Sequence, residues 1–337
     1  MRLTWTRVAG WLLVFAAVVA LIAAASLLVG TEHVSASEAL AAWRQPALQA
    51  DSVAYQIVFR QRLPRIALGL LVGFCLGLAG ASFQAILRNP LADPYTLGVA
   101  SGSAVGAVVA ISVPRVWTLG PFSSVQAASL VGALVIVTLI YSLGLRRRVL
   151  RLEALLLGGV TVALVGSSAI LLIRTLSDPL HLVAIDRWMM GGLAVIGARE
   201  IAAVLPLMLP GVVLLLLLAA PFNQLALGED LAYGRGVDPQ QVQKWAFFAG
   251  SLVTAAAVSV SGPIGFVGLI VPHAVRRLIG PDHRALLPCA GLASGAFLIA
   301  CDTVARTVVA PSEMPVGVVT AVIGGPLFVW ILLRRLA

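Results

Sequence analysis

The side chains of this sequence that could do chemistry are few, and their spacing predicts no catalytic centre. The only lysine, Lys244, is followed by Trp245, so the Gly-Lys-Ser/Thr sequence of an ATP-binding P-loop is missing. No histidine is followed by glutamate, which excludes a His-Glu-x-x-His zinc motif. Ser101 lies one position too late within residues 98–102 for a nucleophile elbow. We therefore expect no enzyme active site, metal or cofactor in this chain.

The three cysteines lie in apolar runs and show no metal-ligand spacing, so we interpret them as small buried hydrophobes: Cys75, Cys289 and Cys301. Arginine is the more informative residue. Arg60, Arg62 and Arg65 precede one apolar run, and Arg306 follows Asp302 by four residues, the spacing of a helical ion pair. We expect these arginines to be exposed at the outer surface, where such a group suits a carboxylate partner and equally suits the anchoring of helix ends at a membrane surface.

The composition places these residues in a membrane protein. Of 337 residues, 60% are hydrophobic and only 11% are charged, against about 25% charged in soluble domains. The mean hydropathy is +1.01. So apolar a chain is not disordered, and its net charge of +9 comes from arginines between apolar runs rather than from a basic stripe on a polar fold. We therefore predict a membrane partner and no nucleic acid.

Nine uncharged runs have lengths near those of membrane-crossing helices: 8–29, 66–87, 95–113, 122–145, 154–173, 201–222, 245–275, 285–301 and 314–333. The run 245–275 is too long for one helix and contains glycine and proline at 262–265. We divide it into a helix ending near residue 260 and a shorter one from about 265 to 276. The prediction is an all-α protein with ten transmembrane helices in one domain, residues 1–337.

The distribution of basic residues supports the division. With ten helices and a cytoplasmic N-terminus, 14 basic residues lie inside and 9 outside, whereas nine helices give 10 inside and 13 outside. Both termini are therefore expected to be cytoplasmic. The first apolar run has 22 residues, longer than a signal peptide's apolar core, so we expect a retained helix. Segments 31–61 and 174–200 then lie outside, and segment 223–243 lies inside as a short helix, a glycine turn and a second helix start.

Glycines repeat every four residues in three of the apolar runs: Gly69, Gly73 and Gly77; Gly98, Gly102 and Gly106; Gly291 and Gly295. Small residues at this spacing let helix backbones approach closely, within one bundle or at a subunit interface or transport path.

The middles of the ten segments carry no ionisable side chain. An ion-coupled carrier usually needs acids or broken helices near the midplane, and an intramembrane enzyme needs a nucleophile and a base. Both alternatives are therefore weaker than a passive bundle driven by partners.

Three ordered motifs resemble the signatures of FecCD-type permeases, the membrane subunits of ABC importers for iron chelates, haem and cobalamin. The first runs from Arg88 to Gly102, the second from Gly262 to His273, and the third from Met314 to Pro326. The matching residues are Arg88, Asn89, Pro90, Leu91, Ala92, Pro94, Gly98 and Gly102; Gly262, Pro263, Gly265, Pro272 and His273; Pro315, Gly317, Gly324, Gly325 and Pro326.

The resemblance implies a multi-pass protein of the cytoplasmic (inner) membrane that works as a homodimer of ten-helix subunits. It also implies two cytoplasmic ABC ATPase subunits, which bind ATP and Mg, and a periplasmic or lipid-anchored substrate-binding protein. ATP would then be hydrolysed on the partner, and this chain would carry no catalytic residue. An iron-siderophore or haem is the cargo favoured by the family as a whole, while Trp188, Met189 and Met190 resemble a stretch of cobalamin importers.

Site residues follow from the same resemblance, position by position. Coupling to the ATPase is assigned to Leu225, Leu227, Gly228, Glu229, Asp230, Gly234 and Gly236. Docking of the binding protein is assigned to Arg62, Arg65 and Arg306. The translocation path is assigned to Gly158, Gly159, Thr161, Ser167 and Ser168 on the fifth helix, because small and hydroxyl side chains suit a bulky cargo.

Overall fold

The computed structural model describes residues 5–32, 34–44, 52–113, 117–146, 149–194 and 198–336. Some residues used above lie outside this part of the chain. They are the inner-side arginines Arg2, Arg147 and Arg148, and residues 33, 45–51 and 195–197 of the external segments.

The protein is helical, and every predicted apolar segment contains a helix. These helices are α1 (Trp5–Leu28), α5 (Leu63–Ile86), α6 (Val99–Ser112), α7 (Ser124–Gly144), α8 (Leu152–Leu176), α10 (Arg199–Leu217), α13 (Pro239–Ser261), α14 (Val267–Ile279), α15 (His283–Thr307) and α16 (Val316–Leu336). The strands are two-residue hairpins, β1 (Thr118–Leu119) with β2 (Phe122–Ser123) and β3 (Leu145–Arg146) with β4 (Val149–Leu150).

Seven helices of the described chain are long and apolar enough to cross a membrane: α1, α5, α7, α8, α10, α13 and α15. The break within 245–275 is confirmed, since α13 ends at Ser261 and α14 begins at Val267. At 1.5 Å per residue the 13 residues of α14 rise about 20 Å, less than the ~30 Å of a bilayer core. Ten crossings and the side of each terminus therefore stay predictions.

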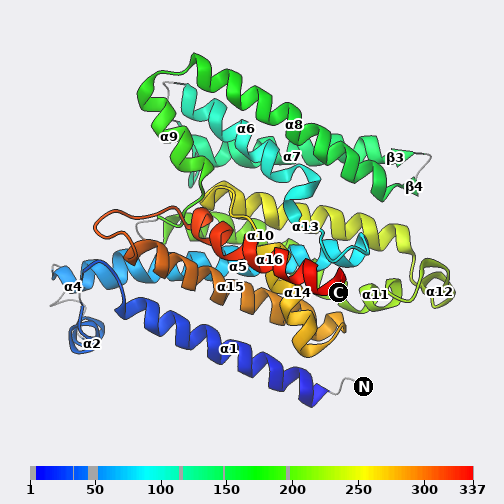
Figure 1. Cartoon of the computed structure of the whole chain (residues 1–337), viewed down its shortest axis with the longest axis horizontal. Coiled ribbons are helices and arrows are strands. Elements are labelled where there is room, and N and C mark those ends of the chain that lie inside the picture. Colours follow the sequence, from blue (N-terminus) through cyan, green and yellow to red (C-terminus); the bar gives the residue numbers. More distant parts are fainter. Residues whose placement is uncertain are drawn as a thin grey trace.

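Figure 1 shows α1 along one side of the molecule and α8 along the opposite side, with α5 among the helices between them. Burial follows this order, because 78% of the apolar window of α5 is buried and only 6% of that of α1. α5 forms the core because its sequence offers both glycines and large aliphatic side chains to its neighbours. The helices at the two sides leave their leucines and valines exposed for lipid or for another chain.

The glycine repeats pack helices of this chain against one another. A Cβ on Gly73 of α5 would lie 2.7 Å from the Cα of Gly295 on α15, and one on Gly102 of α6 would lie 2.6 Å from the carbonyl oxygen of Gly132 on α7. Such distances leave no room for a methyl group. Packing within one bundle is therefore the role of these glycines.

The segments between the long helices gather at two ends of the bundle. The end proposed as external carries α2 (Ala36–Arg44), α4 (Val53–Tyr55), the π-helix η1 (Gln56–Arg62) and α9 (Pro179–Met189). The end proposed as internal carries α11 (Ala219–Leu225) and α12 (Glu229–Gly234), together with the N-terminus (Figure 1). The expected short helix, glycine turn and second helix start of segment 223–243 are confirmed as α12, Gly236 and the start of α13.

Candidate functional site

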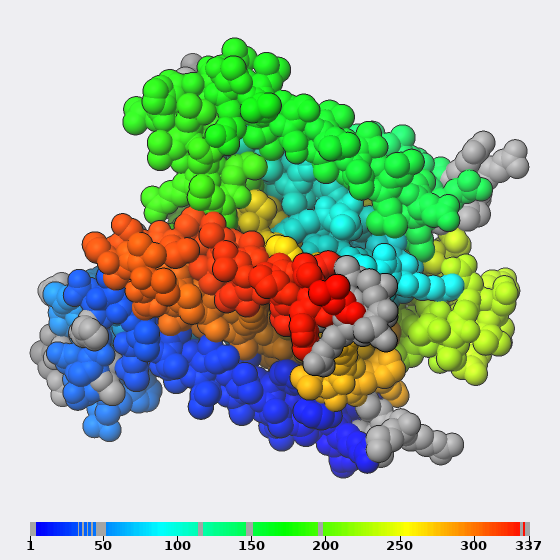
Figure 2. Space-filling model, in the orientation of Figure 1, coloured from blue at the N-terminus to red at the C-terminus, as the bar shows by residue number. Residues whose placement is uncertain are grey.

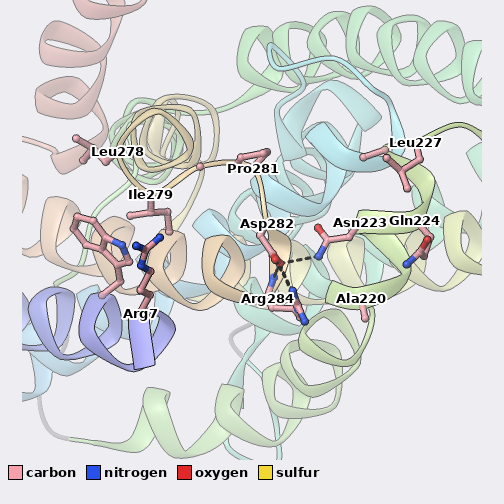
Figure 3. A pocket seen from close by; sticks show the side chains of 13 residues that line it. Arg7, Ala220, Asn223, Gln224, Leu227, Leu278, Ile279, Pro281, Asp282 and Arg284 are labelled. Atoms are coloured by element: carbon pink, nitrogen blue, oxygen red, sulfur yellow. Dashed lines mark hydrogen bonds and ion pairs between the residues drawn. The ribbon is translucent and has the colours of Figure 1, made fainter. Parts of the chain in front are cut away.

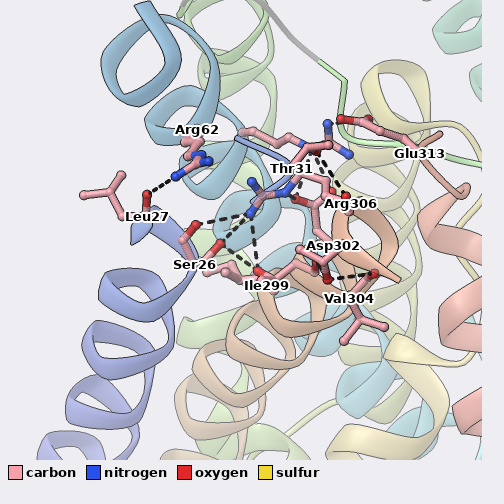
Figure 4. Close-up of polar contacts among 12 residues, drawn as sticks. Ser26, Leu27, Thr31, Arg62, Ile299, Asp302, Val304, Arg306 and Glu313 are labelled. Carbon is pink, nitrogen blue, oxygen red and sulfur yellow. Dashed lines mark hydrogen bonds and ion pairs between the residues drawn. The ribbon is translucent and has the colours of Figure 1, made fainter. Parts of the chain in front are cut away.

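The outer end holds a group of charges, most of them buried, which we call the outer cluster: Arg62, Arg65, Asp302, Arg306 and Glu313. Asp302 lies at its centre and is 2% exposed. Its carboxylate accepts hydrogen bonds from Nε of Arg65 at 2.8 and 3.0 Å and from Nε of Arg306 at 3.1 Å (Figure 4). The expected helical ion pair of Asp302 and Arg306 is thus confirmed, and Arg65 makes it a three-membered group that joins α5 to α15.

The same cluster fastens the end of α1. Nη1 of Arg62 donates to the carbonyl oxygens of Leu27 and Leu28 at 2.8 and 3.2 Å, where the last turn of α1 leaves carbonyls without helical partners. Nη2 of Arg306 donates to Oγ of Ser26 at 2.9 Å. A buried guanidinium needs such partners, because an unpaired buried charge is very costly.

These contacts correct one expectation about the docking arginines, namely that their side chains are exposed. Arg62 is 4% exposed and Arg306 is 5% exposed, and both point into the protein. The Arg65 side chain is 11% exposed and also pairs with Glu313, whose carboxylate accepts a hydrogen bond from Nη1 of Arg65 at 2.8 Å. Arg60, two residues before Arg62, is exposed at this end.

A cavity of about 440 Å³ opens beside the outer cluster, between the end of α9 and the loop before α16. Its wall combines charged side chains with apolar and sulfur-containing ones, among them Arg65, Arg187, Glu313, Val183, Met190 and Met314. Met190 and Met314 are the two thioethers in this wall. Methionine suits large apolar ligands because its side chain is flexible and polarisable.

At the inner end, α11 is attached to the start of α15 through one side chain. Nδ2 of Asn223 donates to Oδ1 of Asp282 at 2.7 Å, and its Oδ1 accepts from the backbone N–H of His283 at 2.8 Å. Oδ1 of Asn223 also lies 2.8 Å from Nδ1 of His283. Hydrogen bonds from Arg284 and Asn223 lower the pKa of Asp282 to about 2, so this carboxylate is charged at neutral pH (Figure 3).

α12 is attached to the bundle by Glu229. Its Oε1 lies 3.3 Å from Nη2 of Arg88 at the end of α5, and 3.3 Å from Nε2 of Gln243 on α13. The side chains of Arg88 and Glu229 are 48% and 46% exposed, so this pair is weak and in contact with water. From the sequence we treat Arg88 as a signature residue and Glu229 as a coupling residue, and we do not predict their pair or the contacts of Asn223. Both contacts join positions that are far apart in the chain.

The coupling residues lie together in and around α11 and α12. Gly228, with φ of 118°, leads into α12, and Gly236, with φ of 81°, follows it; Gly234 ends the helix, and Asp230 lies in its first turn. Leu225 is buried and fixes α11 to the core. This segment exposes large side chains: Leu227 is 52% exposed, Leu231 57% and Tyr233 72%. An apolar and aromatic surface outside the bundle is typical of a protein contact.

The expected path residues divide into two groups. Thr161, Ser167 and Ser168 are exposed on α8, and their hydroxyls donate to carbonyls of their own helix at 2.8 to 3.1 Å. Gly159 is buried instead, because the carbonyl of Thr96 lies against it, and Gly158 faces Ile140 of α7. The two glycines therefore pack within the chain, and the three hydroxyl residues face outward.

The three signature motifs meet inside the bundle. The hydroxyl of Tyr95, in the 3-10 helix η2 (Pro94–Leu97), donates to the carbonyl of Ile264 at 2.9 Å and accepts from its N–H at 3.0 Å. Gly268 packs on Pro94, and a Cβ on Gly324 would lie 2.6 Å from Cβ of Phe266. The signature residues thus position the break between α13 and α14. Among them, Gly98 and Gly262 form tight turns, Pro272 and His273 are buried, and the loop after α5 consists of Arg88, Asn89, Pro90, Leu91 and Ala92.

The fold and these contacts define a multi-pass membrane protein with an apolar bundle and polar contacts gathered at its two ends. The profile of the FecCD transport family matches residues 16–334. The chain therefore belongs to the FecCD transport family, and it is a permease of the ABC-importer type in the inner membrane.

Relatives with curated names agree with this family. The chain is 44% identical over 284 residues to the cobalamin import system permease protein BtuC of Halobacterium salinarum, covering 83% of this chain and 74% of that protein. It is 39% identical to the hemin transport system permease protein HmuU of Yersinia pestis, covering 81% of this chain and 82% of that protein. It is also similar to a solved structure described as an inward-facing conformation of a metal-chelate type ABC transporter, with a TM-score of 0.82, 30% identity, and coverage of 97% and 99%.

Proposed function

We propose that this chain is one of two identical permease subunits of an ABC importer, and that it moves a metal-bearing macrocycle of the cobalamin or haem class into the cell. ATP would be hydrolysed on two partner subunits, and a substrate-binding protein would deliver the cargo outside. The observation that carries this proposal is the likeness to a metal-chelate type transporter over nearly the whole length of both chains.

The second copy would face α8 and α16. Figure 2 shows this face of the molecule hollowed between α8, in green, and α16, in red, with cyan and yellow segments at its floor. Thr161 and Ser168 lie on the exposed side of α8, and Val322 and Leu327 are exposed on α16. Two such hollowed faces brought together would enclose a path lined by hydroxyl and apolar side chains.

The ATPase would bind the surface formed by Leu227, Leu231 and Tyr233. Behind this surface, Asn223 ties α11 to α15, and Glu229 ties α12 to α5 and α13. A movement of the ATPase would therefore pull on three helices of the bundle. This arrangement converts closure of the ATPase into a rigid-body shift of helices, which is a common way of switching a membrane protein.

The binding protein would dock at the outer end through Arg60 and Arg65. A carboxylate of the partner can replace Glu313 on Arg65, because Glu313 is 40% exposed and its pair with Arg65 lies at the surface. Arg62 and Arg306 would support this surface from below by fixing α1, α5 and α15. The resemblance assigned docking to all three arginines, and the geometry favours a supporting role for two of them.

The cargo class rests on the relatives and on the outer cavity. The named relatives carry cobalamin and hemin in their names, and both are flat metal-bearing macrocycles. The cavity beside Met190 and Met314 offers the apolar, thioether-rich wall that such a ring needs. An iron-siderophore is the second candidate, because the description of the structural relative names metal chelates in general and no particular cargo.

The test is ATP-dependent uptake by liposomes that contain the permease with its ATPase and binding protein. Labelled cobalamin, haem and one ferric siderophore would be compared at equal concentration. We expect uptake of cobalamin or haem only when ATP and both partners are present. Uptake driven by a proton or sodium gradient without ATP would contradict the ABC-importer reading, and uptake of the siderophore alone would contradict the macrocycle.

A further inference from the structure

A large cavity at the inner end lies between α1 and α11, and its wall shares Asn223 and Leu227 with the coupling segment. Its volume is about 990 Å³. Arg7 and Trp11 of α1 line it, together with Asn223, Leu227, the loop residues Gly280, Pro281 and Asp282, and Arg284. Figure 3 shows Arg7 on one side and Asn223 on the other, with Asp282 and Arg284 between them. Three helices have one terminus at this level: α1 and α15 begin here, and α14 ends here.

The charges of this cavity favour an anion. Within the described residues Arg7 is exposed and has no carboxylate partner, so all five of its N–H groups are open to a ligand. Asp282 is the acid in the wall, and Arg284 offsets it through two hydrogen bonds of 3.1 and 2.7 Å. Among the described residues, Nη1 of Arg284 has no hydrogen-bond partner. The wall therefore carries one net positive charge and donors on two sides.

The apolar side chains of the same wall favour a lipid over a soluble anion. Leu278 is 67% exposed, and Trp11 follows Arg7 by one turn of α1. α1 is the least buried of the long apolar helices, so the cavity opens at the edge of the bundle, where lipid surrounds the protein. A tryptophan and an arginine at the end of a membrane helix are typical of the headgroup level, and basic pockets between helices on the cytoplasmic side bind lipid headgroups.

We propose that this cavity binds the phosphate headgroup of an anionic phospholipid of the inner leaflet, with Arg7 and Arg284 contacting the phosphate and Trp11 and Leu278 contacting the glycerol and the first acyl carbons. The bound lipid would join α1 to the start of α15 and to α11. The binding step does not depend on the proposed transport function, because it needs only this chain in a membrane or a detergent.

The test uses the purified full chain in a neutral detergent and native mass spectrometry. The probes are dioleoyl-phosphatidylglycerol, dioleoyl-phosphatidylcholine and free glycerophosphate. We expect saturable binding of phosphatidylglycerol and little of phosphatidylcholine. Arg7→Gln is expected to lower the affinity for phosphatidylglycerol about fivefold, the effect of one arginine near an anionic surface. Glycerophosphate binding equal to that of the lipid would assign the cavity to a soluble phosphate and overturn the lipid proposal.

The matched control is Arg277→Gln, which removes an exposed arginine of the same end of the bundle that does not line the cavity. We expect it to change the affinity less than twofold. Thermal unfolding of each variant checks that the fold is intact. If both variants lost the same affinity for phosphatidylglycerol, the loss would come from the general positive charge of this surface and not from the cavity. Unchanged lipid binding in Arg7→Gln, together with loss of ATPase binding, would assign the cavity to the ATPase; either result overturns the proposal.

Discussion

The two ends of the bundle use arginine in different ways. In the outer cluster the guanidinium groups point inward, and Asp302, backbone carbonyls and Ser26 partner them below the surface. At the inner end, Arg88 and Glu229 form a long pair that is about half exposed, and Arg7 has no carboxylate partner among the described residues. Buried charges are costly to separate, whereas exposed pairs exchange partners easily. The outer cluster is therefore suited to fixing helices, and the inner end to changing contacts.

The largest effect is expected from removing the central acid of the outer cluster. Asp302→Ala leaves the buried Arg306 and the nearly buried Arg65 without their shared carboxylate. Breaking such a group costs about 3–5 kcal/mol of unfolding free energy. Thermal unfolding in detergent, or the yield of folded protein, measures it. The control Glu313→Gln removes a 40% exposed acid and is expected to cost less than about 1 kcal/mol. Similar losses in both variants would contradict a structural outer cluster.

The next effect concerns the turn before α12. Gly228 has φ of 118° and ψ of 153°, a conformation that costs other residues about 1–3 kcal/mol. Gly228→Ala is therefore expected to displace the coupling segment and to lower ATP-dependent uptake on the order of tenfold, since 1.4 kcal/mol corresponds to that factor. Uptake per ATP hydrolysed is the measurement.

Gly10→Ala is the control for Gly228→Ala. Gly10 lies in α1 with an ordinary backbone, and nothing lies within 4 Å of where its Cβ would be. Uptake by this variant is expected to stay close to that of the unmodified protein. If the two substitutions had the same effect, or if Gly228→Ala left uptake unchanged, the segment would not have the coupling role.

A smaller effect is expected at the outer surface, where two substitutions should act in opposite directions. Arg60→Glu is expected to weaken binding of the substrate-binding protein about fivefold, because it reverses an exposed charge on the docking surface. Glu313→Gln is expected to strengthen binding slightly, because a carboxylate no longer competes for Arg65. Surface plasmon resonance measures both, with Arg277→Glu on the inner side as control. If neither substitution changed the affinity, the binding protein would dock at another surface.

The smallest effect on stability is expected from the inner ion pair. Arg88→Gln removes a contact of 3.3 Å between half-exposed side chains, and such pairs contribute about 0–1 kcal/mol. Its unfolding temperature should therefore lie close to that of the unmodified protein, while the number of ATP molecules per transported cargo should rise. A loss of stability as large as that of Asp302→Ala would remove the distinction between the two ends.

The sequence alone predicted several elements closely, for a physical reason that is local. Apolar runs near 20 residues marked the helices, and the glycine and proline at 262–265 marked the break, since α13 ends at Ser261 and α14 begins at Val267. The repeated glycines marked close helix packing, which Gly73 and Gly102 confirm. Each of these signals depends on residues within one or two turns of a helix, so no knowledge of distant neighbours was needed.

The candidate site was predicted less fully, because its residues act through distant partners. The spacing of Asp302 and Arg306 predicted their pair, but nothing in the spacing placed Arg65, 237 positions earlier in the chain, on the same carboxylate. Likewise Asn223 reaches Asp282 across 59 positions, and Tyr95 reaches Ile264 across 169. No periodicity records such contacts.

What the sequence determined by itself is the membrane character of the chain, its helices and their breaks, because burial in lipid demands long apolar segments whatever the neighbours are. What only the tertiary structure decided is the direction of the polar side chains. Arg60 and Arg62 are two residues apart, yet Arg60 is open at the surface and Arg62 caps α1 from within. The difference arises because carbonyls at the end of α1 lie beside one of them and not beside the other.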